Sequence, residues 1–518
     1  MFTATKESLL LSNVQKEIWL NQTLHPDIPL YNIGGYMDMP TAIDVPLFER
    51  AIRHVVSSSD ALCTQLIPTE TIPTWESCFP EDFPYVFVDF SQEIEAEKAG
   101  LAYMKDSFQQ AFTLHNSPLF KFALIKVSDS KYFWFKKYHH LITDGWGTAL
   151  IVQEVIETYI KYSKNENVFT ESLPYTDYIF NEIDFFESER YQKNLSYWLK
   201  QFTTIPEAHF NTIQASRNGD VFPSRNSQNK ISWESYQRLK DFSKAHDLTI
   251  FPVLLGLIYL YFTRTSQEED LCIGLPNLNR SNKKFRKSHG VFANVTPNRF
   301  QFSHSLKLGE LTQEIKKQLS TGFRHQRISI TELHKKINLR SQNRNQLFEI
   351  MFSFEKQDYD LELSGQKIRS IALMNGYEQT PLSVFLREYQ QGEDVVIDIE
   401  SNTQYLDEAS AQLLSKRLIH LVENIDQFYD LPLSEIDILP EEEKQKVLYE
   451  WNDTKVDYPK DKTVIDLFKE QVKKRPDAIA LILAEEEMTY KELDERSNQL
   501  ARYLMDQGVK TEDLIGVC

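Results

Sequence analysis

Glycine is scarce in this chain, with 16 residues among 518, about 3% against a typical ~7%. This scarcity excludes collagen-like repeats and long glycine-rich linkers. Only four cysteines are present, no two of them form a CxxC unit, and no Cys/His cluster has zinc-finger spacing. The sequence therefore excludes a disulfide scaffold and indicates a reducing, cytoplasmic compartment.

Basic residues and long apolar runs are also lacking. The chain has 57 Lys and Arg against 75 Asp and Glu, a net charge of -18, so we expect no nucleic-acid partner, which would need a basic surface. The longest apolar run, Phe251–Phe262, is too short to cross a bilayer but long enough for a buried helix. Residues 1–20 lack the basic end, apolar core and cleavage site of a signal peptide. We therefore expect no membrane span.

The sequence is rich in hydrophobic residues, at 41%. The spacing of these residues alternates along the chain between the period of a helix and that of a strand. Helical stripes occur at residues 46–57 and 148–159. Between them, 119–127 and 131–140 are typical of strands, and the turn at 128–130 predicts that they form a hairpin. Further strands are predicted at 271–276, 291–297, 347–354 and 395–400, followed by a helix at 408–425. This pattern predicts an α/β or α+β layered fold with two lobes.

A boundary is predicted near residue 440. Residues 436–460 contain Pro440 and the acidic run Glu441–Glu443, which is typical of a linker with a short helix. A new α/β pattern follows in 461–518, with helices at 464–474 and 491–507 and a strand at 478–483. Residues 514–518 (LIGVC) read as another strand, so we expect the chain to be the front part of a longer polypeptide.

The densest polar cluster, residues 138–146, lies where the predicted hairpin ends and the next helix begins. Side chains alternate along a strand, so His139 and His140 should point in opposite directions, and one of them can face a cleft. A histidine can accept and return a proton near neutral pH, which predicts a general base or proton-transfer group. The competing interpretation is a pair of structural histidines. We expect no metal, since adjacent histidines on opposite faces cannot easily share an ion.

Other catalytic signatures are missing. The sequence has no GxSxG elbow, no cysteine in a nucleophile motif and no P-loop. The glycine-rich phosphate loop of an adenylating enzyme is missing too. The histidine cluster is therefore the main candidate for catalysis.

Residues 139–145 (HHLITDG) match the HHxxxDG motif and resemble the condensation domains of nonribosomal peptide synthetases. Other stretches resemble the remaining motifs of that family in the same order: Leu11–Trp19 (LSNVQKEIW), Asp60–Thr64 (DALCT), Tyr175–Tyr178 (YTDY), Ile273–Pro276 (IGLP) with Asn279 and Arg280, Gly290–Asn294 (GVFAN), Arg324–Gln326 (RHQ), and Leu347–Phe348. This resemblance covers about residues 8–435. Residues 460–518 resemble the start of an adenylation domain, in Asp466–Phe468, Arg475–Ala478 and Thr489–Leu493.

The resemblance implies a two-lobed, V-shaped fold like that of chloramphenicol acetyltransferase. We expect the N-terminal lobe at 1–177, the C-terminal lobe at 178–435, the linker at 436–460 and a truncated α/β adenylation start at 461–518. The fragment lacks the nucleotide and carrier motifs, so it should bind no cofactor covalently. Its substrates would be 4′-phosphopantetheine thioesters or acyl-CoA, and its partners a downstream acceptor carrier protein in the same polypeptide and an acyl donor on CoA or on a carrier.

The resemblance also assigns roles within the motif. His140 would be the catalytic histidine, with His139 beside it, and the Gly145 N–H would stabilise the oxyanion. Asp144 and Trp146 would be structural, and the substrate tunnel would be lined by Tyr175, Asn294 and Arg280.

Three positions depart from the family pattern. Cys63 replaces an arginine that pairs with the motif aspartate, Glu17 stands where arginine is common, and Gly147 stands where serine is often found. Either another cation neutralises Asp144 or hydrogen bonds alone hold the loop.

Several functions remain open. The chain begins about ten residues before the first motif, and its opening and residues 29–35 (PLYNIGG) favour a starter domain that uses a fatty-acyl donor. The alternative donor is a peptidyl or aminoacyl group from an upstream synthetase protein. Further alternatives are a non-catalytic recruitment platform, an epimerisation domain and a free-standing CoA-dependent acyltransferase. The intact motif disfavours the platform, and the adenylation-like tail disfavours the other two.

Overall fold

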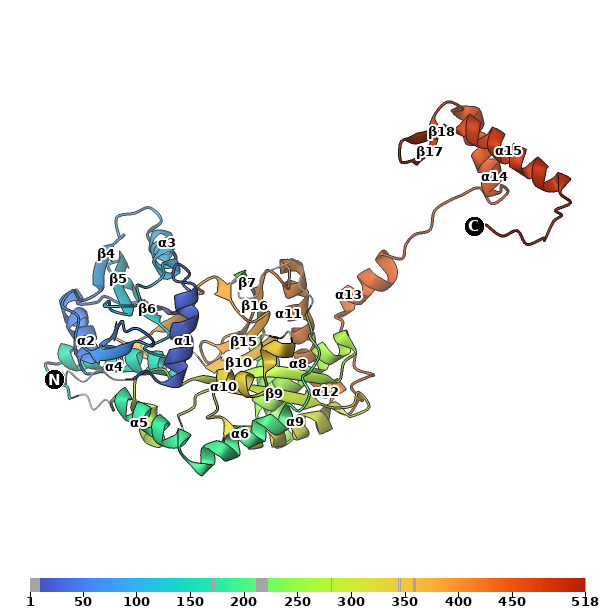
Figure 1. Cartoon of the computed structure of the whole chain (residues 1–518). Helices are drawn as coiled ribbons and strands as arrows, with labels where there is room; N and C mark the ends of the chain where they lie inside the picture. The colour runs from blue at the N-terminus through green and yellow to red at the C-terminus, as the bar shows by residue number, and fades with distance from the viewer. Residues whose placement is uncertain are drawn as a thin grey trace. The chain divides into compact units, whose positions relative to one another are not determined.

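The computed structural model describes residues 10–169, 173–210, 222–280, 282–342, 344, 346–356 and 360–517. The chain divides into two compact units, Met1–Pro440 and Glu441–Cys518. The first unit contains a five-stranded and a seven-stranded sheet, each flanked by helices (Figure 1). The fold is thus the mixed α/β arrangement that the sequence predicts. The division at Pro440 falls inside the predicted linker, whereas the predicted lobe boundary at residue 177 lies within helix α5 (Tyr175–Phe186).

The N-terminal sheet has the order β13-β1-β6-β5-β4. Strands β5 (Phe120–Ser128) and β6 (Lys131–His139) form the predicted antiparallel hairpin. Large apolar side chains alternate between the two faces of these strands, so a buried apolar cluster forms on each face. The other elements of this half are α1 (Asn13–Leu24), β1 (Asn32–Met39), α2 (Val45–Ser57), β2 (Thr64–Ile67), β3 (Thr74–Ser77), β4 (Tyr85–Asp89), α3 (Ala96–Gln109) and α4 (Gly145–Ser163).

The C-terminal sheet has the order β14-β7-β16-β15-β10-β8-β9. The predicted apolar run forms helix α8 (Ile250–Ser266), which is buried against one face of this sheet. The strands are β7 (Phe222–Ile231), β8 (Asp270–Asn277), β9 (Asn294–Gln301), β10 (Ile350–Lys356), β14 (Tyr377–Glu378), β15 (Leu382–Glu388) and β16 (Val395–Asn402). The other helices are α6 (Glu189–Gln201), α7 (Trp233–Ala245), α9 (Leu308–Gly322), α10 (Ile330–Lys336), α11 (Glu408–Glu423) and α12 (Ile425–Phe428).

One strand crosses between the two halves of the first unit. Strand β13 (Arg369–Ala372) belongs to the C-terminal half by sequence but pairs antiparallel with β1 of the N-terminal sheet. A small hairpin, β11 (Glu362–Leu363) with β12 (Gln366–Lys367), precedes it. Sequence periodicity does not predict β13, because four residues are too few to show a period. The crossing strand fixes the C-terminal half against β1.

The second unit contains the predicted elements after the linker. The linker helix is α13 (Glu441–Gln445), followed by a π-helical turn, and the unit continues with α14 (Val464–Lys474), β17 (Ile479–Leu483), β18 (Glu486–Thr489) and α15 (Tyr490–Asp506). The predicted terminal strand is wrong for residues 514–517, which have no partner strand in the part of the chain that is described; Cys518 lies outside that part.

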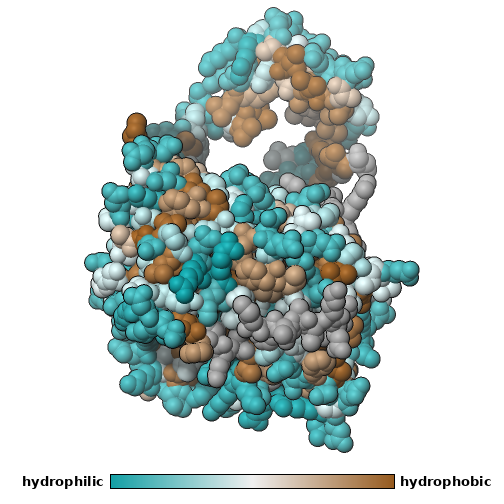
Figure 2. Space-filling view, turned by 90° about the vertical axis from the view of Figure 1, so that its left-hand side faces the viewer, coloured by the Kyte–Doolittle hydropathy of each residue, from teal (hydrophilic) through white to brown (hydrophobic). Residues whose placement is uncertain are grey.

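Both units expose some apolar side chains. Figure 2 shows a mostly hydrophilic face with scattered apolar residues on the first unit. The second unit exposes Ile479, Leu481, Ile482 and Leu483 along a single strand. Among the described residues, no single helix is long and apolar enough to cross a membrane; α7 and α8 meet the length and composition test only as a pair bent by 106°.

Candidate active site

The HHxxxDG segment joins the end of β6 to the start of helix α4. Asp144 is the N-cap of this helix, and its Oδ1 accepts a hydrogen bond from the Gly147 N–H at 2.8 Å. Aspartate is favoured at this position because its carboxylate satisfies an N–H that has no intrahelical partner. The side chain of Asp144 is only 1% exposed. A buried carboxylate needs further donors to offset its lost hydration.

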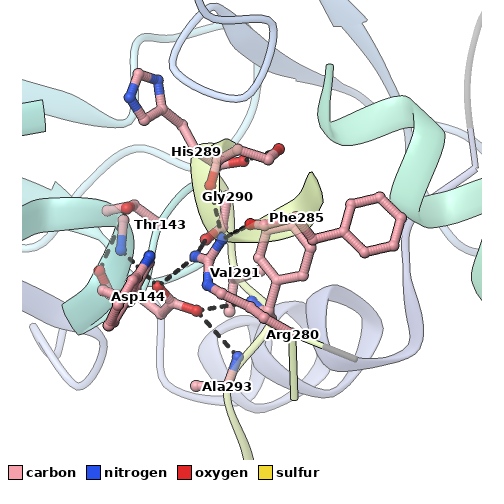
Figure 3. Close-up of polar contacts among 12 residues, drawn as sticks. Thr143, Asp144, Arg280, Phe285, His289, Gly290, Val291 and Ala293 are labelled. Carbon is pink, nitrogen blue, oxygen red and sulfur yellow. Dashed lines mark hydrogen bonds and ion pairs between the residues drawn. The ribbon is translucent and has the colours of Figure 1, made fainter. Parts of the chain in front are cut away.

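Those donors come from the C-terminal half of the unit. Arg280 Nη2 donates to Asp144 Oδ1 at 2.9 Å, and the N–H groups of Phe292 and Ala293 donate to Oδ2 at 2.9 and 3.0 Å. Figure 3 shows Arg280 and Ala293 in contact with the Asp144 carboxylate. Asp144 therefore receives three N–H groups and one guanidinium. The cation that compensates for Cys63 is Arg280.

Arg280 is itself held in a fixed orientation. Its Nη1 donates to the carbonyls of Phe285 and Ser288 at 2.6 and 2.7 Å, and its guanidinium lies 3.9 Å from the centroid of the Phe292 ring. Its side chain is 1% exposed. The expectation that Arg280 lines a substrate tunnel stays a prediction, while its contacts give it the task of positioning the motif loop.

His139 points into the N-terminal half. Its Nδ1 accepts from the Leu141 N–H at 3.2 Å, its Nε2 lies 3.3 Å from Gln22 Oε1, and its ring packs against Tyr31 and Phe112. Burial, with the nearby charges of His140 and Lys137, lowers the pKa of His139 to about 3. The ring is neutral and both nitrogens are engaged, so this geometry supports the loop. A catalytic part for His139 stays a prediction.

His140 differs from its neighbour. Its backbone N–H donates to the Tyr31 carbonyl at 2.8 Å, and its side chain is half-buried. Burial lowers the pKa of His140, opposed by polar backbone groups of His140 and Thr143 and by the charge of Asp144. In the described part of the chain, no other side chain forms a hydrogen bond with the ring, and its Nδ1 is left without a partner. A neutral imidazole with an unengaged nitrogen can accept a proton.

The glycines and tryptophan after Asp144 complete the loop. Gly145 is exposed, and as the first residue of α4 its N–H has no intrahelical acceptor. Trp146 Nε1 donates to the Arg286 carbonyl at 2.9 Å. A Cβ on Gly147 would lie 2.3 Å from Thr143 Oγ1, so the tight packing of this loop accounts for glycine where the family often has serine.

The two remaining tunnel candidates are also engaged. Tyr175 is fully buried; its hydroxyl lies 2.9 Å from Ser12 Oγ and donates to the Val291 carbonyl at 2.6 Å. Asn294 Nδ2 donates to the carbonyls of Gln326 and Ile328. Their contacts fix loops around the motif, and their predicted contact with substrate stays untested by this geometry.

The second motif is held by a residue to which sequence reasoning gave no role. Asp60 accepts hydrogen bonds from the N–H groups of Tyr175 and Thr176 at 2.9 and 3.1 Å, and so caps α5. Cys63 donates to the Val56 carbonyl, and burial raises its pKa to about 12, which disfavours a reactive thiolate. Glu17 accepts from the Ser329 hydroxyl, which joins α1 to the start of α10. The sequence signal for Asp60 was only its place in the motif.

Two surface hollows in the described residues do not have His140 in their lining. One is lined by residues of β4, β5 and β6, including Lys137, and the other by residues of α5 with Phe285. The predicted tunnel to His140 therefore stays a prediction. Within the described chain, no three His, Cys, Asp or Glu side chains are grouped to hold a metal.

Comparison with known sequences identifies the two parts of the chain. A family profile described as "Condensation domain" matches residues 5–448, and one described as "AMP-binding enzyme" matches residues 468–518. The chain is 28% identical over 509 residues to a dimodular nonribosomal peptide synthase of Bacillus subtilis (strain 168), covering 98% of this chain and 21% of that protein. It is 26% identical over 528 residues to bacitracin synthase 3 of Bacillus licheniformis, covering 99% and 8%. The chain thus spans about a fifth of the length of the first relative and less than a tenth of the second.

Solved structures share the fold. The starter condensation domain of rhizomide synthetase RzmA, in a mutant complex with C8-CoA, has a TM-score of 0.75 at 24% identity and covers 83% of this chain and 97% of that one. The first condensation domain of the calcium-dependent antibiotic synthetase, in complex with a substrate analogue, has a TM-score of 0.73 at 19% identity, covering 84% and 100%. The chain belongs to the condensation-domain family, the amide-forming acyltransferases of nonribosomal peptide synthetases, and continues into the start of an AMP-binding segment.

Proposed function

We propose that this chain joins an acyl thioester to the amine of an aminoacyl thioester, with His140 as the catalytic residue. The observation that carries the proposal is the contrast within the motif. His140 has an unengaged ring nitrogen, while the loop that bears it is held by Asp144 and Arg280. Such a support positions a catalytic group without taking part in the chemistry.

The chemistry fits a neutral imidazole. An α-amine has a pKa of about 8, so only a minor fraction is free base near pH 7. As the amine attacks the thioester carbonyl, the C–N bond forms, the C–S bond breaks, and the proton lost from nitrogen passes to the leaving thiolate through His140. A positioned base contributes about 10²–10⁴-fold. We propose that the Gly145 N–H stabilises the oxyanion, and its position at the N-terminus of α4 supports this role.

We propose a fatty-acyl donor, carried by CoA or by a carrier protein, and an acceptor carrier in the same polypeptide. The opening motif and residues 29–35 support this choice, and the starter domain crystallised with C8-CoA supports it through fold alone. Fold similarity alone does not select the donor, so a peptidyl or aminoacyl group from an upstream synthetase protein is the second candidate. Since these thioesters are made in the cytoplasm, we propose that compartment.

The test is a product assay by mass spectrometry. The chain is mixed with aminoacyl-pantetheine thioesters and a panel of fatty acyl-CoAs and aminoacyl-carrier thioesters. We expect an N-acyl amide that falls at least 100-fold in His140→Ala, but is unchanged in His246→Ala, a histidine at the end of α7. A dipeptide product would support the second donor. No amide from any donor, with carriers still bound, would favour the recruitment platform.

A further inference from the structure

The seven-stranded sheet has one apolar and one charged face. Val395, Ile397 and Ile399 of β16 point into the helix-covered core. The alternate residues Asp398 and Glu400 lie on the opposite face, since side chains alternate along a strand. Arg387 of β15 and Glu355 of β10 share this face through their contacts with Asp398 and with each other.

Most charges on this face are paired. Arg387 contacts Asp398 and lies 2.9 Å from Glu355 Oε2, and Gln228 Nε2 donates to Asp398 Oδ1 at 2.9 Å. Glu378 of β14 accepts from the Thr380 N–H at 3.0 Å and from the Ser383 hydroxyl at 3.1 Å. The Arg387 guanidinium thus serves two carboxylates, and Glu378 is held by a backbone N–H and a hydroxyl.

Glu400 is the exception. Its side chain is nine-tenths buried, with 9% of the residue exposed, yet no hydrogen bond or ion pair joins it to another residue in the described part of the chain. Burial, and then the charge of Glu378, raise the pKa of Glu400 to about 8, against the opposing charge of Arg387. The Glu400 oxygens are not among the fully buried, unpartnered polar atoms of the described residues, so this carboxylate keeps contact with solvent while no protein donor binds it. Its partial burial still costs hydration that no donor in the described chain offsets. A cationic ligand would supply what is missing.

Strand β14, which carries Glu378, lies close to a segment of the candidate active site. Asn375, just before β14, donates to the Leu30 carbonyl at 2.9 Å, which brings β14 against residues 30–32. The charge of Glu378 reaches Tyr31, where it adds to burial in raising the tyrosine pKa. The Tyr31 carbonyl in turn accepts a hydrogen bond from the backbone N–H of His140. Glu378, at the edge of the charged face, therefore lies near the segment that supports the catalytic histidine.

We propose that Glu400, with Glu378 beside it, binds the side-chain ammonium of the acceptor amino acid, so that the domain selects a basic acceptor. This inference rests on the proposed amide-forming function. A fatty-acyl donor has no cation to offer, and an apolar chain against these carboxylates would increase their desolvation cost. A metal is not favoured, because no three ligating side chains are grouped among the described residues.

The experiment compares acceptors that differ only in charge. Octanoyl-CoA is the donor, and the acceptors are ornithyl- and norvalyl-pantetheine, with lysyl and norleucyl thioesters as a second pair. We expect a preference for the basic acceptor, measured as a ratio of kcat/KM values. Glu400→Gln should reduce this ratio about tenfold, the effect of losing one charge-assisted hydrogen bond, and should leave the norvalyl rate unchanged. Glu400→Asp, which keeps the charge, should retain part of the preference.

Each outcome is distinguishable. Glu435→Gln, on an exposed segment of the same unit, is the matched control and should leave the ratio unchanged. Equal rates for both members of each pair, with no effect of Glu400→Gln, would overturn this inference but leave amide formation intact. Equal slowing of both acceptors by Glu400→Gln would also overturn it, by assigning the carboxylate to the shared α-amine or to folding. No amide from any acceptor would instead contradict the proposed function.

Discussion

Two buried carboxylates, one in each half of the first unit, have opposite surroundings. Asp144 receives four hydrogen bonds, from three backbone N–H groups and from Arg280. Glu400 receives none from the described residues, although it is nine-tenths buried. The partners of Asp144 come from both halves of the unit, so its charge holds a loop in place. A carboxylate that burial destabilises and no donor compensates is instead available to a ligand.

The largest expected effect on stability comes from removing the cation beside Asp144. Arg280→Ala leaves the carboxylate buried without its counter-charge, and we expect a loss of ~3–5 kcal/mol in the free energy of unfolding. Urea denaturation followed by tryptophan fluorescence measures it. The double change Asp144→Ala with Arg280→Ala removes both charges and should cost less than the sum of the single changes. Additive losses would mean that the two side chains do not act as a pair.

The packing around Asp144 provides a second test. Gly147→Ala places a Cβ 2.3 Å from Thr143 Oγ1 and 3.4 Å from Asp144 Oδ1, so the loop must shift. We expect a loss of about 1–3 kcal/mol in the free energy of unfolding, typical of overpacking. Gly145→Ala, where a Cβ meets open space, is the matched control and should change stability by less than about 1 kcal/mol. Similar losses in both variants would show that the loop is not tightly packed.

The pH dependence of stability tests the Glu400 side of the comparison. The pKa of Glu400 is raised from its ordinary 4.5 to about 8 in the folded chain. Between these pH values the folded state binds more protons than the unfolded state, so this group's contribution to stability falls as pH rises, until about pH 8. Glu400→Gln has no such dependence. The stability of this variant relative to the parent should therefore increase from pH 5 to pH 8, in thermal unfolding; a constant difference would contradict the unpartnered carboxylate.

The smallest expected effect is on the pH at which the His140-dependent rate falls as the solution becomes more acidic. The pKa of His140 is lowered by burial, so the imidazole stays unprotonated below its ordinary 6.5. The ratio of amide-forming rates for the parent and His140→Ala cancels the titration of the acceptor amine. We expect this ratio to fall only below pH 6.5. A midpoint above 6.5 would mean that the charge of Asp144 outweighs the effect of burial on the His140 imidazole.

The sequence predicts the local elements well and the long-range pairings poorly. Helix 46–57, the hairpin ending at His139 and the buried helix at 251–262 follow from apolar periods, and the structure has them. Strand β13 has no such signal, since its pairing with β1 depends on a contact across more than 300 residues. A local pattern does not encode which distant strand supplies a partner.

The site shows the same limit. Motif spacing singles out the histidine pair, and strand alternation predicts that His139 and His140 face different surroundings. It does not reveal that Arg280 reaches Asp144, because the two are 136 residues apart. Glu400 reads in sequence as an ordinary polar residue in an alternating strand. Its isolation is a property of its neighbours in the folded sheet.

The measurement that tests the account most directly is the free energy of unfolding of Asp144→Asn and Glu400→Gln, determined side by side in urea at pH 8. Both changes remove one buried charge and preserve side-chain shape. We expect Asp144→Asn to destabilise the first unit, since Arg280 loses its counter-ion, and Glu400→Gln to stabilise it, since an uncompensated charge is removed. Effects of the same sign would contradict the distinction between a structural carboxylate and one available to a ligand.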